Sequence, residues 1–284
     1  MIIGIVGNYR KEIFFDIIDV ISKATFCKKP QFLLSNDYKS ISPDISFSGI
    51  KSDNFDIVIN KADVVIAIGG DGTILSSIRR MGDISKPIFG IHIGGLGFLS
   101  ACDSDNIIDS INLLVNKDYK IEPRLLLEVE VDKKTHIALN DIVIDKGILS
   151  RIIKLEVEID NLLLNNYESD GIIISSPTGS TAYSLSAGGP IVSYDVEGII
   201  LTPLSSHSLS ARPIIVNSKK HISVSVDNEN NHFAVTIDGQ VRIDCQCNQV
   251  VKIKKSSIVA NIVRIEGDYY STLRKKMGWA GNLR

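Results

Sequence analysis

The sequence lacks a long hydrophobic run and carries almost no net charge. A membrane-spanning helix needs about 18 consecutive apolar residues, and no stretch of the chain reaches that length. The formal net charge is −2, so nothing in the composition favours bulk binding of nucleic acid or of an anionic membrane. We therefore expect neither a nucleic-acid nor a membrane partner, and any site for a polyanion has to be local.

Cysteine is also scarce. The four cysteines, Cys27, Cys102, Cys245 and Cys247, do not form a disulfide framework, and no second pair of ligands stands at zinc spacing. The first residues, MIIGIVGNYRKE, have neither the length nor the cleavage pattern of a secretory signal. Together these features predict a cytoplasmic protein without a structural metal.

The chain has 284 residues, of which 44% are hydrophobic and 23% are charged. This is the composition of a soluble globular protein that is long enough for two domains. The first part alternates apolar strands with amphipathic segments, which predicts a doubly wound parallel sheet. The expected strands are residues 1–7, 63–68 and 87–95, and the expected helices are Asn8–Lys23, Thr73–Arg80 and Asp103–Asn116, the last with Asp103 or Ser104 as its N-cap.

The pattern changes near Tyr119 to short, alternating, β-branched runs separated by turn residues such as Asp160-Asn161 and Asp238-Gly239. Helical character returns at Asp268–Trp279. The predicted architecture is therefore an α/β domain over residues 1–118, completed by residues 266–284, and a β-rich, sandwich-like domain over residues 119–265. We expect the C-terminal helix to pack back on the first domain.

The stretch VVIAIGGDGTIL, Val64–Leu75, has the layout of a phosphate-binding turn. Glycines after a parallel strand let backbone amides approach an anion, and the following helix N-terminus adds positive potential. Neither the dinucleotide fingerprint nor the P-loop lysine is present, and a plain strand-to-helix turn with Asp71 as N-cap is the alternative. Beside phosphates, Asp71 could accept a proton from a hydroxyl nucleophile or help to hold Mg²⁺.

Two further segments carry polar groups suited to a nucleotide. The segment PTGSTAYSLSAGG within Asp170–Pro190 is dense in hydroxyls and glycine and has one aromatic side chain, Tyr183, on which a ring could pack. Asn140 and Asp141 interrupt an apolar strand, and their side chains could bind an adenine edge or ribose hydroxyls. A serine-rich loop and a β-bulge or turn are the structural alternatives.

Taken together, these motifs resemble the NAD kinase family over almost the whole chain. The resemblance rests on GGDGT at Gly69–Thr73, GxLGFL at Gly94–Leu99, the Asn140-Asp141 pair and the long segment Asp170–Pro190. SLSARPIIV at Ser208–Val216, DGQ at Asp238–Gln240 and LRKKMGW at Leu273–Trp279 complete it. GGDGT alone is shared with lipid kinases and phosphofructokinases, whereas the serine-rich segment and SLSARP are more specific.

The resemblance implies transfer of the γ-phosphoryl group of ATP, or of polyphosphate, to the 2′-hydroxyl of the adenosine ribose of NAD, with Mg²⁺ or another divalent cation accompanying ATP. It implies Asp71 as the catalytic base and a homodimer or homotetramer. The implied NAD-binding residues are Asp71, Gly72, Asn140, Asp141, Arg151, Glu168, Asp170, Thr181, Ala182, Tyr183, Ser184, Leu185, Ser186 and Gln240.

Three positions depart from the family pattern. Asp141 replaces the commoner glutamate, His92 stands where asparagine is frequent, and Glu168 stands where relatives often carry a basic residue. Two other functions are weighed against the kinase. A lipid or sphingoid kinase would need an apolar acyl pocket or a membrane-binding patch, which the hydroxyl-rich segment disfavours. A non-catalytic NAD-binding regulator would be expected to lose the GGDG carboxylate or the Asn-acidic pair, and both are present.

Overall fold

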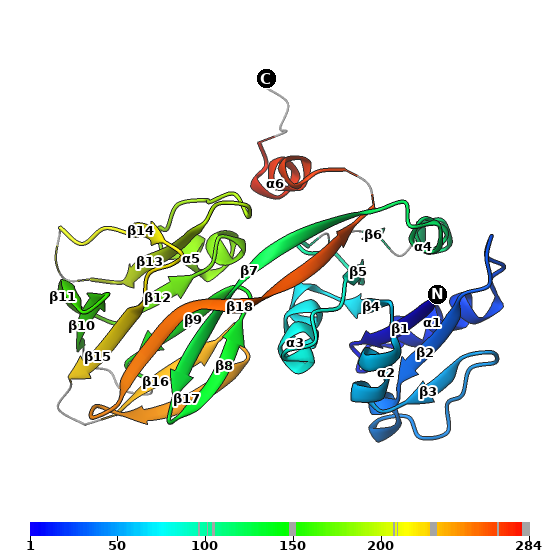
Figure 1. Cartoon of the computed structure of the whole chain (residues 1–284), viewed down its shortest axis with the longest axis horizontal. Helices are drawn as coiled ribbons and strands as arrows, with labels where there is room; N and C mark the ends of the chain where they lie inside the picture. Colours follow the sequence, from blue (N-terminus) through cyan, green and yellow to red (C-terminus); the bar gives the residue numbers. More distant parts are fainter. Residues whose placement is uncertain are drawn as a thin grey trace. The chain divides into compact units, whose positions relative to one another are not determined.

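The computed structural model describes residues 1–95, 97–100, 102–103, 106–147, 152–206, 208, 210–227, 232–265 and 267–279. The chain divides into two compact units. The first comprises Met1–Pro123 and Ala260–Arg284, and the second comprises Arg124–Val259. In Figure 1 most of the first unit is blue to cyan, its α6 is red, and the strands of the second unit run from green to orange.

The first unit is built from a parallel sheet and helices. Its elements are β1 (Ile2–Gly7), α1 (Glu12–Lys23), β2 (Gln31–Ser35), the 3₁₀ helix η1 (Asn36–Ser40), β3 (Lys51–Asp53), α2 (Phe55–Lys61), β4 (Val64–Gly69), α3 (Asp71–Met81), β5 (Ile88–His92), β6 (Cys102–Asp103), α4 (Ile107–Asn116) and α6 (Tyr269–Met277).

The strand order is β3-β2-β1-β4-β5, with β6 and the end of β18 (Val250–Arg264) beside β5, and the described pairings among them are parallel. From β1 the chain adds β2 and β3 on one side and then β4 and β5 on the other, so the strand order reverses between β1 and β4. In open parallel sheets ligands bind beyond the carboxyl ends of the strands at such a switch point. The carboxyl end of β4 is Gly69, directly before the GGDGT turn, so the topology alone marks this turn as a binding edge.

Helices cover both faces of this sheet because its strands are apolar on both sides. One apolar cluster joins residues of β1, β4 and β5 to the buried faces of α1 and α4. On the other face, glycines let the helices approach closely: a methyl group at Gly4 would lie 3.0 Å from Val58 of α2, and one at Gly90 would lie 2.5 Å from Ile74 of α3. The predicted doubly wound α/β domain is confirmed.

Within its described residues, the second unit is all-β apart from one short helical segment. Its elements are β7 (Lys120–Val131, which begins in the first unit), β8 (Lys134–Ala138), β9 (Asp141–Asp145), β10 (Ile153–Ile159), β11 (Leu162–Ser169), β12 (Gly171–Ser175), the 3₁₀ helix η3 (Thr178–Thr181), α5 (Tyr183–Ser186), β13 (Gly198–Leu204), β14 (Ile214–Asn217), β15 (Ile222–Asp227), β16 (His232–Ile237), β17 (Val241–Gln246) and most of β18.

Two sheets in the second unit pack face to face. One has the order β14-β13-β12-β9-β16-β17, and the other contains β11, β10, β15, β18, β7 and β8. Alternate residues such as Ile142 and Ile144 of β9 and Leu155 and Val157 of β10 meet in one apolar core. This alternation places every second side chain inside and confirms the predicted sandwich-like domain.

The helix ends differ in places from the sequence prediction. Helix α4 begins at Ile107 with Asn106 in the N-cap position, so the expected start at Asp103 is wrong; Asp103 ends β6 instead, and Ser104 lies outside the described residues. Helix α6 starts with a capping box between Asp268 and Ser271, which holds two orphan amides of its first turn. It belongs to the first unit, as expected.

Candidate active site

Asp71 is the first residue of α3, immediately after the carboxyl end of β4. Gly70, in an extended conformation, occupies the N-cap position, so the alternative of Asp71 as an N-cap is wrong. Gly69 lies close against Thr73, since a methyl group at Gly69 would come within 2.1 Å of the Thr73 hydroxyl. The turn is tight because only glycine fits there, and the first turn of α3 brings its amides and positive helix potential to this edge.

The Asp71 carboxylate is tied to the loop after β5. It accepts the backbone amide of Phe98 at 2.8 Å and that of Leu99 at 3.2 Å, one bond to each oxygen. A methyl group at Gly97 would come within 2.0 Å of the Asp71 carboxylate. An ionised carboxylate has about four acceptor positions, so Asp71 is held by this loop and keeps further lone pairs for a hydroxyl group.

A buried ion pair supports the same loop. The Ser100 hydroxyl accepts the amide of Gly97 at 3.1 Å, and the Ser100 carbonyl accepts from the Arg264 guanidinium at 3.2 Å. Arg264 also lies 3.3 Å from the Glu122 carboxylate, and these two side chains are only 6% and 11% exposed. Sequence reasoning missed Arg264, although a lone arginine in the apolar strand ending NIVRI was a usable signal.

His92 ends β5 and pairs in register with Gly69 of β4. Its side chain is buried, and neither ring nitrogen has a hydrogen-bond partner among the described residues. Buried polar atoms are nearly always paired. The departure at position 92 therefore places an unsatisfied imidazole at the binding edge of the parallel sheet.

In the second unit, Asn140 lies at the break between β8 and β9 and its backbone is held from one side by serines. The Asn140 carbonyl accepts the amide of Ser176 at 2.9 Å and the Ser175 hydroxyl at 3.2 Å. The Ser176 hydroxyl donates to the carbonyl of Leu139. Gly179 packs on the same carbonyl of Asn140, because a methyl group there would come within 2.0 Å of it.

The other side of this break is held by Asp238. Its carboxylate accepts the amides of Leu139, Asn140 and Asp141 at 3.3, 2.8 and 3.3 Å. Asp141 itself is 4% exposed. Burial, and secondarily the charge of Asp238, raises the pKa of Asp141 from 3.8 to about 7. Asn140 and Asp141 thus form one polar cluster with Asp238, a residue that the sequence had indicated only as part of a turn and of the DGQ motif.

The hydroxyl-rich segment is ordered mainly by its own hydrogen bonds. The residues predicted to bind NAD, Thr181–Ser186, run from the end of η3 through α5. Ser184 is buried and hydrogen-bonds Thr202 of β13 at 2.9 Å, whereas Tyr183 is 49% exposed. The buried hydroxyl of Thr178 has no hydrogen-bond partner in the described part of the chain. The segment therefore offers one exposed aromatic ring and one unsatisfied hydroxyl near Asn140.

Asp170 lies at the opposite end of β12 from this cluster. Its carboxylate forms an ion pair with Lys146 at 2.6 Å. The antiparallel register pairs Ser175 with Asp141 at one end and Gly171 with Asp145 at the other. Four residue steps separate the two ends of β12, which is about 13 Å of extended chain. One ligand can contact both ends only if it is long.

The remaining predicted residues lie elsewhere or are not described. Gly72 is exposed in the first turn of α3, and Gln240 is exposed directly after Asp238 and Gly239, just before β17 begins. Glu168 is exposed on β11, opposite Lys154 of β10, and lines an open depression with it. Arg151 lies outside the described residues.

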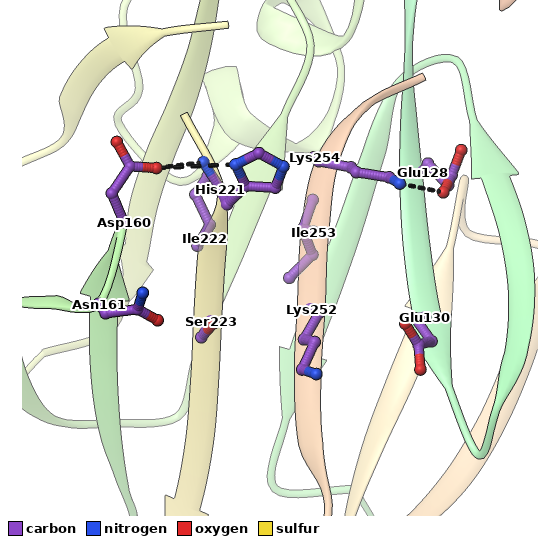
Figure 2. A pocket seen from close by; sticks show the side chains of 10 residues that line it. All are labelled: Glu128, Glu130, Asp160, Asn161, His221, Ile222, Ser223, Lys252, Ile253 and Lys254. Atoms are coloured by element: carbon purple, nitrogen blue, oxygen red, sulfur yellow. Dashed lines mark hydrogen bonds and ion pairs between the residues drawn. The ribbon is translucent and has the colours of Figure 1, made fainter. Parts of the chain in front are cut away.

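The second unit also has a pocket of about 430 Å³ on the outer face of one sheet (Figure 2). Lys254 and Glu128, on the strands β18 and β7, form an ion pair of 3.0 Å at one side of it, and Asp160 lies beside His221 at the other. None of the predicted site residues lines this pocket. Its charges are of both signs and largely paired, so it does not resemble a site for a polyanion.

The described residues contain no group of three or more histidine, cysteine, aspartate or glutamate side chains that could hold a metal ion. Mg²⁺ is commonly bound through one or two carboxylates together with substrate phosphates. A magnesium ion held in this way needs fewer protein ligands than such a group contains.

Family models match both units. Residues 23–119 match the ATP-NAD kinase N-terminal domain, and residues 139–265 match the ATP-NAD kinase C-terminal domain. An NAD kinase of Thermoanaerobacter sp. (strain X514) is 35% identical over 285 residues, which cover 97% of this chain and 98% of the relative. An NAD kinase of Gemmatimonas aurantiaca is 39% identical over 226 residues, which cover 77% of this chain and 78% of the relative.

Solved structures have the same fold. The crystal structure of yeast NADH kinase complexed with NADH superposes with a TM-score of 0.86 at 25% identity, covering 100% of this chain and 89% of that one. The structure of an NAD kinase from Archaeoglobus fulgidus in complex with ATP has a TM-score of 0.74 at 23% identity and covers 98% of each chain. The second likeness concerns the fold alone.

The doubly wound unit and the β-sandwich match the two domains of an ATP-dependent phosphotransferase. The chain belongs to the NAD kinase family. It is an enzyme that phosphorylates NAD. Because the match covers both units, the lipid-kinase alternative, which shares only the GGDGT turn, and the non-catalytic regulator are set aside.

Proposed function

We propose that the enzyme transfers the γ-phosphoryl group of magnesium-bound ATP to the 2′-hydroxyl of the adenosine ribose of NAD, producing NADP and ADP. The observation that carries the mechanism is the Asp71 carboxylate, fixed by two amides at the switch point of the parallel sheet. Its position at the start of α3 puts a proton acceptor beside a phosphate-binding turn.

In this mechanism the ribose hydroxyl donates its proton to Asp71. The hydroxyl oxygen forms a bond to the γ-phosphorus, and the bond from that phosphorus to the bridging oxygen breaks, leaving ADP. The glycine-flanked amides at the start of α3 stabilise the phosphoryl oxygens, which carry the charge of the transition state. The bonds from Phe98 and Leu99 orient the carboxylate without using all of its acceptor positions.

Asn140 and the segment Thr181–Ser186 bind NAD in this proposal, together with Asp141, Asp170 and Gln240. The support is chemical. The cluster around Asn140 presents a carboxamide that no described residue hydrogen-bonds, and Tyr183 offers an exposed ring on which a base can stack. Asp170 lies just beyond the far end of β12, a strand about 13 Å long, and a ligand of this length suits a dinucleotide better than a mononucleotide. Gly72, Arg151 and Glu168 stay in the proposed set on the family resemblance alone.

We further propose a cytoplasmic homodimer or homotetramer. All four cysteines are free thiols, which suits a reducing compartment. None of the helices that the structure describes has the length and hydropathy required to cross a bilayer. The isoleucines Ile214 and Ile215 of the edge strand β14 are 37% and 46% exposed and offer apolar surface to a second copy. Light scattering after size-exclusion chromatography would measure the assembly.

The proposed mechanism is tested with Asp71→Asn. Removing a general base lowers turnover by about 10²- to 10⁴-fold, while the NAD dissociation constant should stay within a few-fold of the parent value. Asp83→Asn, at an exposed position just after α3, is the matched control and should be fully active. Parent-like turnover in Asp71→Asn would exclude Asp71 as the base.

A second measurement identifies the substrates. NAD and NADH are each offered with ATP, other triphosphates and polyphosphate, and the phosphorylated position of the product is determined by NMR. Phosphorylation at any position other than the adenosine 2′-hydroxyl would contradict the proposed reaction, whichever donor is used.

A further inference from the structure

Asp238 is the first of three residues that connect β16 to β17 and is 7% exposed. Its φ of 49° and the φ of 64° at Gly239 are the left-handed values of a type I′ hairpin turn. Aspartate in such a turn commonly bonds its own backbone. Here the carboxylate instead accepts three amides from a different segment, Leu139 to Asp141.

This arrangement fixes the backbone around Asn140 from both sides. The Asp238 carboxylate accepts the amides of this segment, while Ser175 and Ser176 donate to the carbonyls of Leu139 and Asn140. The amide of Asp238 also donates to the carbonyl of Asp141 at 2.9 Å. Of the polar groups of Asn140, only the side-chain carboxamide has no hydrogen-bond partner among the described residues.

The arrangement is costly in stability. Directly beyond the pairing of Ile237 with Ile142, the Asp238 amide donates to the Asp141 carbonyl, so two carboxyl groups of 4% and 7% exposure lie close enough for their charges to interact. Like charges directly opposite on neighbouring strands are destabilising, and buried carboxylates are worse. A simple hairpin turn would not require it.

We propose that Asp238 is a positioning residue for NAD: its carboxylate locks the backbone of Leu139 to Asp141 and so aims the Asn140 carboxamide at the dinucleotide, without touching the ligand. The inference rests on the proposed NAD-binding role of Asn140. Asp238 acts on binding through Asn140 and takes no part in proton transfer.

The test is Asp238→Asn, which keeps the left-handed turn and the side-chain shape. It replaces one acceptor oxygen by an NH₂ group that faces an amide donor. Hydrogen bonds to charged groups are strong enough that we expect the KM for NAD to rise about 10- to 100-fold, with the KM for ATP and kcat within a few-fold of the parent values. A fall in kcat with an unchanged KM for NAD would overturn the proposal.

The matched control is Asp160→Asn. Asp160 also opens a tight hairpin turn with left-handed backbone, with φ of 51° at Asp160 and 63° at Asn161, and likewise accepts an amide from another segment, that of His221 at 2.9 Å. The Asp160→Asn variant should leave the KM for NAD and the KM for ATP unchanged. An equal rise of the KM for NAD in Asp238→Asn and Asp160→Asn would show a general effect of weakening hairpins and would refute the positioning role of Asp238.

A double-variant cycle separates this inference from the proposed function. Asn140→Ala should raise the KM for NAD, and Asp238→Asn in that background should add little, because its effect passes through Asn140. If Asn140→Ala has no effect, the proposed role of Asn140 fails. If Asn140→Ala has its effect and Asp238→Asn adds its full factor to it, the positioning role alone fails.

Ser176→Ala provides a second route if Asp238→Asn does not fold. It removes the hydroxyl bond to the Leu139 carbonyl from the opposite side of the same segment. We expect the same rise in the KM for NAD and the same lack of additivity with Asn140→Ala. An unchanged KM for NAD in a folded Ser176→Ala protein would refute the view that this backbone has to be held for NAD to bind.

Discussion

The pKa of Asp141 leads to a prediction about stability against pH. Burial first, and the charge of Asp238 second, raise this pKa from 3.8 to about 7. An acid whose pKa is raised by folding stabilises the fold fully below its unfolded pKa, and the stabilisation is lost as pH rises through the folded pKa. One pH unit corresponds to about 1.4 kcal/mol, so the enzyme loses about 4 kcal/mol between pH 4 and pH 7 through this group.

Asp141→Asn removes the titration while keeping the size and shape of the side chain. About 1.5 kcal/mol of the loss has occurred by pH 5 and nearly all of it by pH 8. The free energy of unfolding of the variant, relative to that of the parent, should therefore be higher at pH 8 than at pH 5 by about 2.5 kcal/mol. The sign follows from the fact that the amide stays neutral at both pH values.

Urea unfolding followed by far-UV circular dichroism at the two pH values measures this difference. Asp244→Asn is the control, because Asp244 lies on β17 of the same sheet but its side chain is 75% exposed, and it should show no such dependence. The same difference between Asp141→Asn and the parent at pH 5 and pH 8 would mean that Asp141 titrates normally, and the argument from its burial would be wrong.

Two further predictions concern the first unit. Gly97→Ala places a methyl group within 2.0 Å of the Asp71 carboxylate, and a displacement of about 1 Å in a catalytic group costs on the order of 100-fold in turnover. Gly95→Ala, where nothing lies within 4 Å, should be harmless, and equal activities in a steady-state assay would contradict the placement of Asp71. Arg264→Met removes the guanidinium from a buried ion pair with Glu122 and should lower the free energy of unfolding by about 3–5 kcal/mol. Glu122→Gln in the same chain should restore part of that stability in urea titrations.

Local pattern was enough for much of the fold. The apolar run at residues 63–68 predicted a strand of a parallel sheet, which the structure has at Val64–Gly69. The alternation in the second half predicted a sandwich, because strands buried on one face show an apolar residue at every second position. The ends of the helices were predicted less accurately than the strands. The start of α4 was placed too early, since polar residues before an amphipathic segment suit a cap as well as a loop.

The sequence by itself determined the family and the residue types at the site, because GGDGT, the Asn-acidic pair and the serine-rich segment are contiguous motifs whose chemistry is local. Only the tertiary structure decided what holds these groups. Asp71 is fixed by amides 27 and 28 residues away, and the backbone of Asn140 by Asp238, 98 residues away. Hydrogen bonds over such separations depend on strand order and register, which side-chain periodicity does not encode.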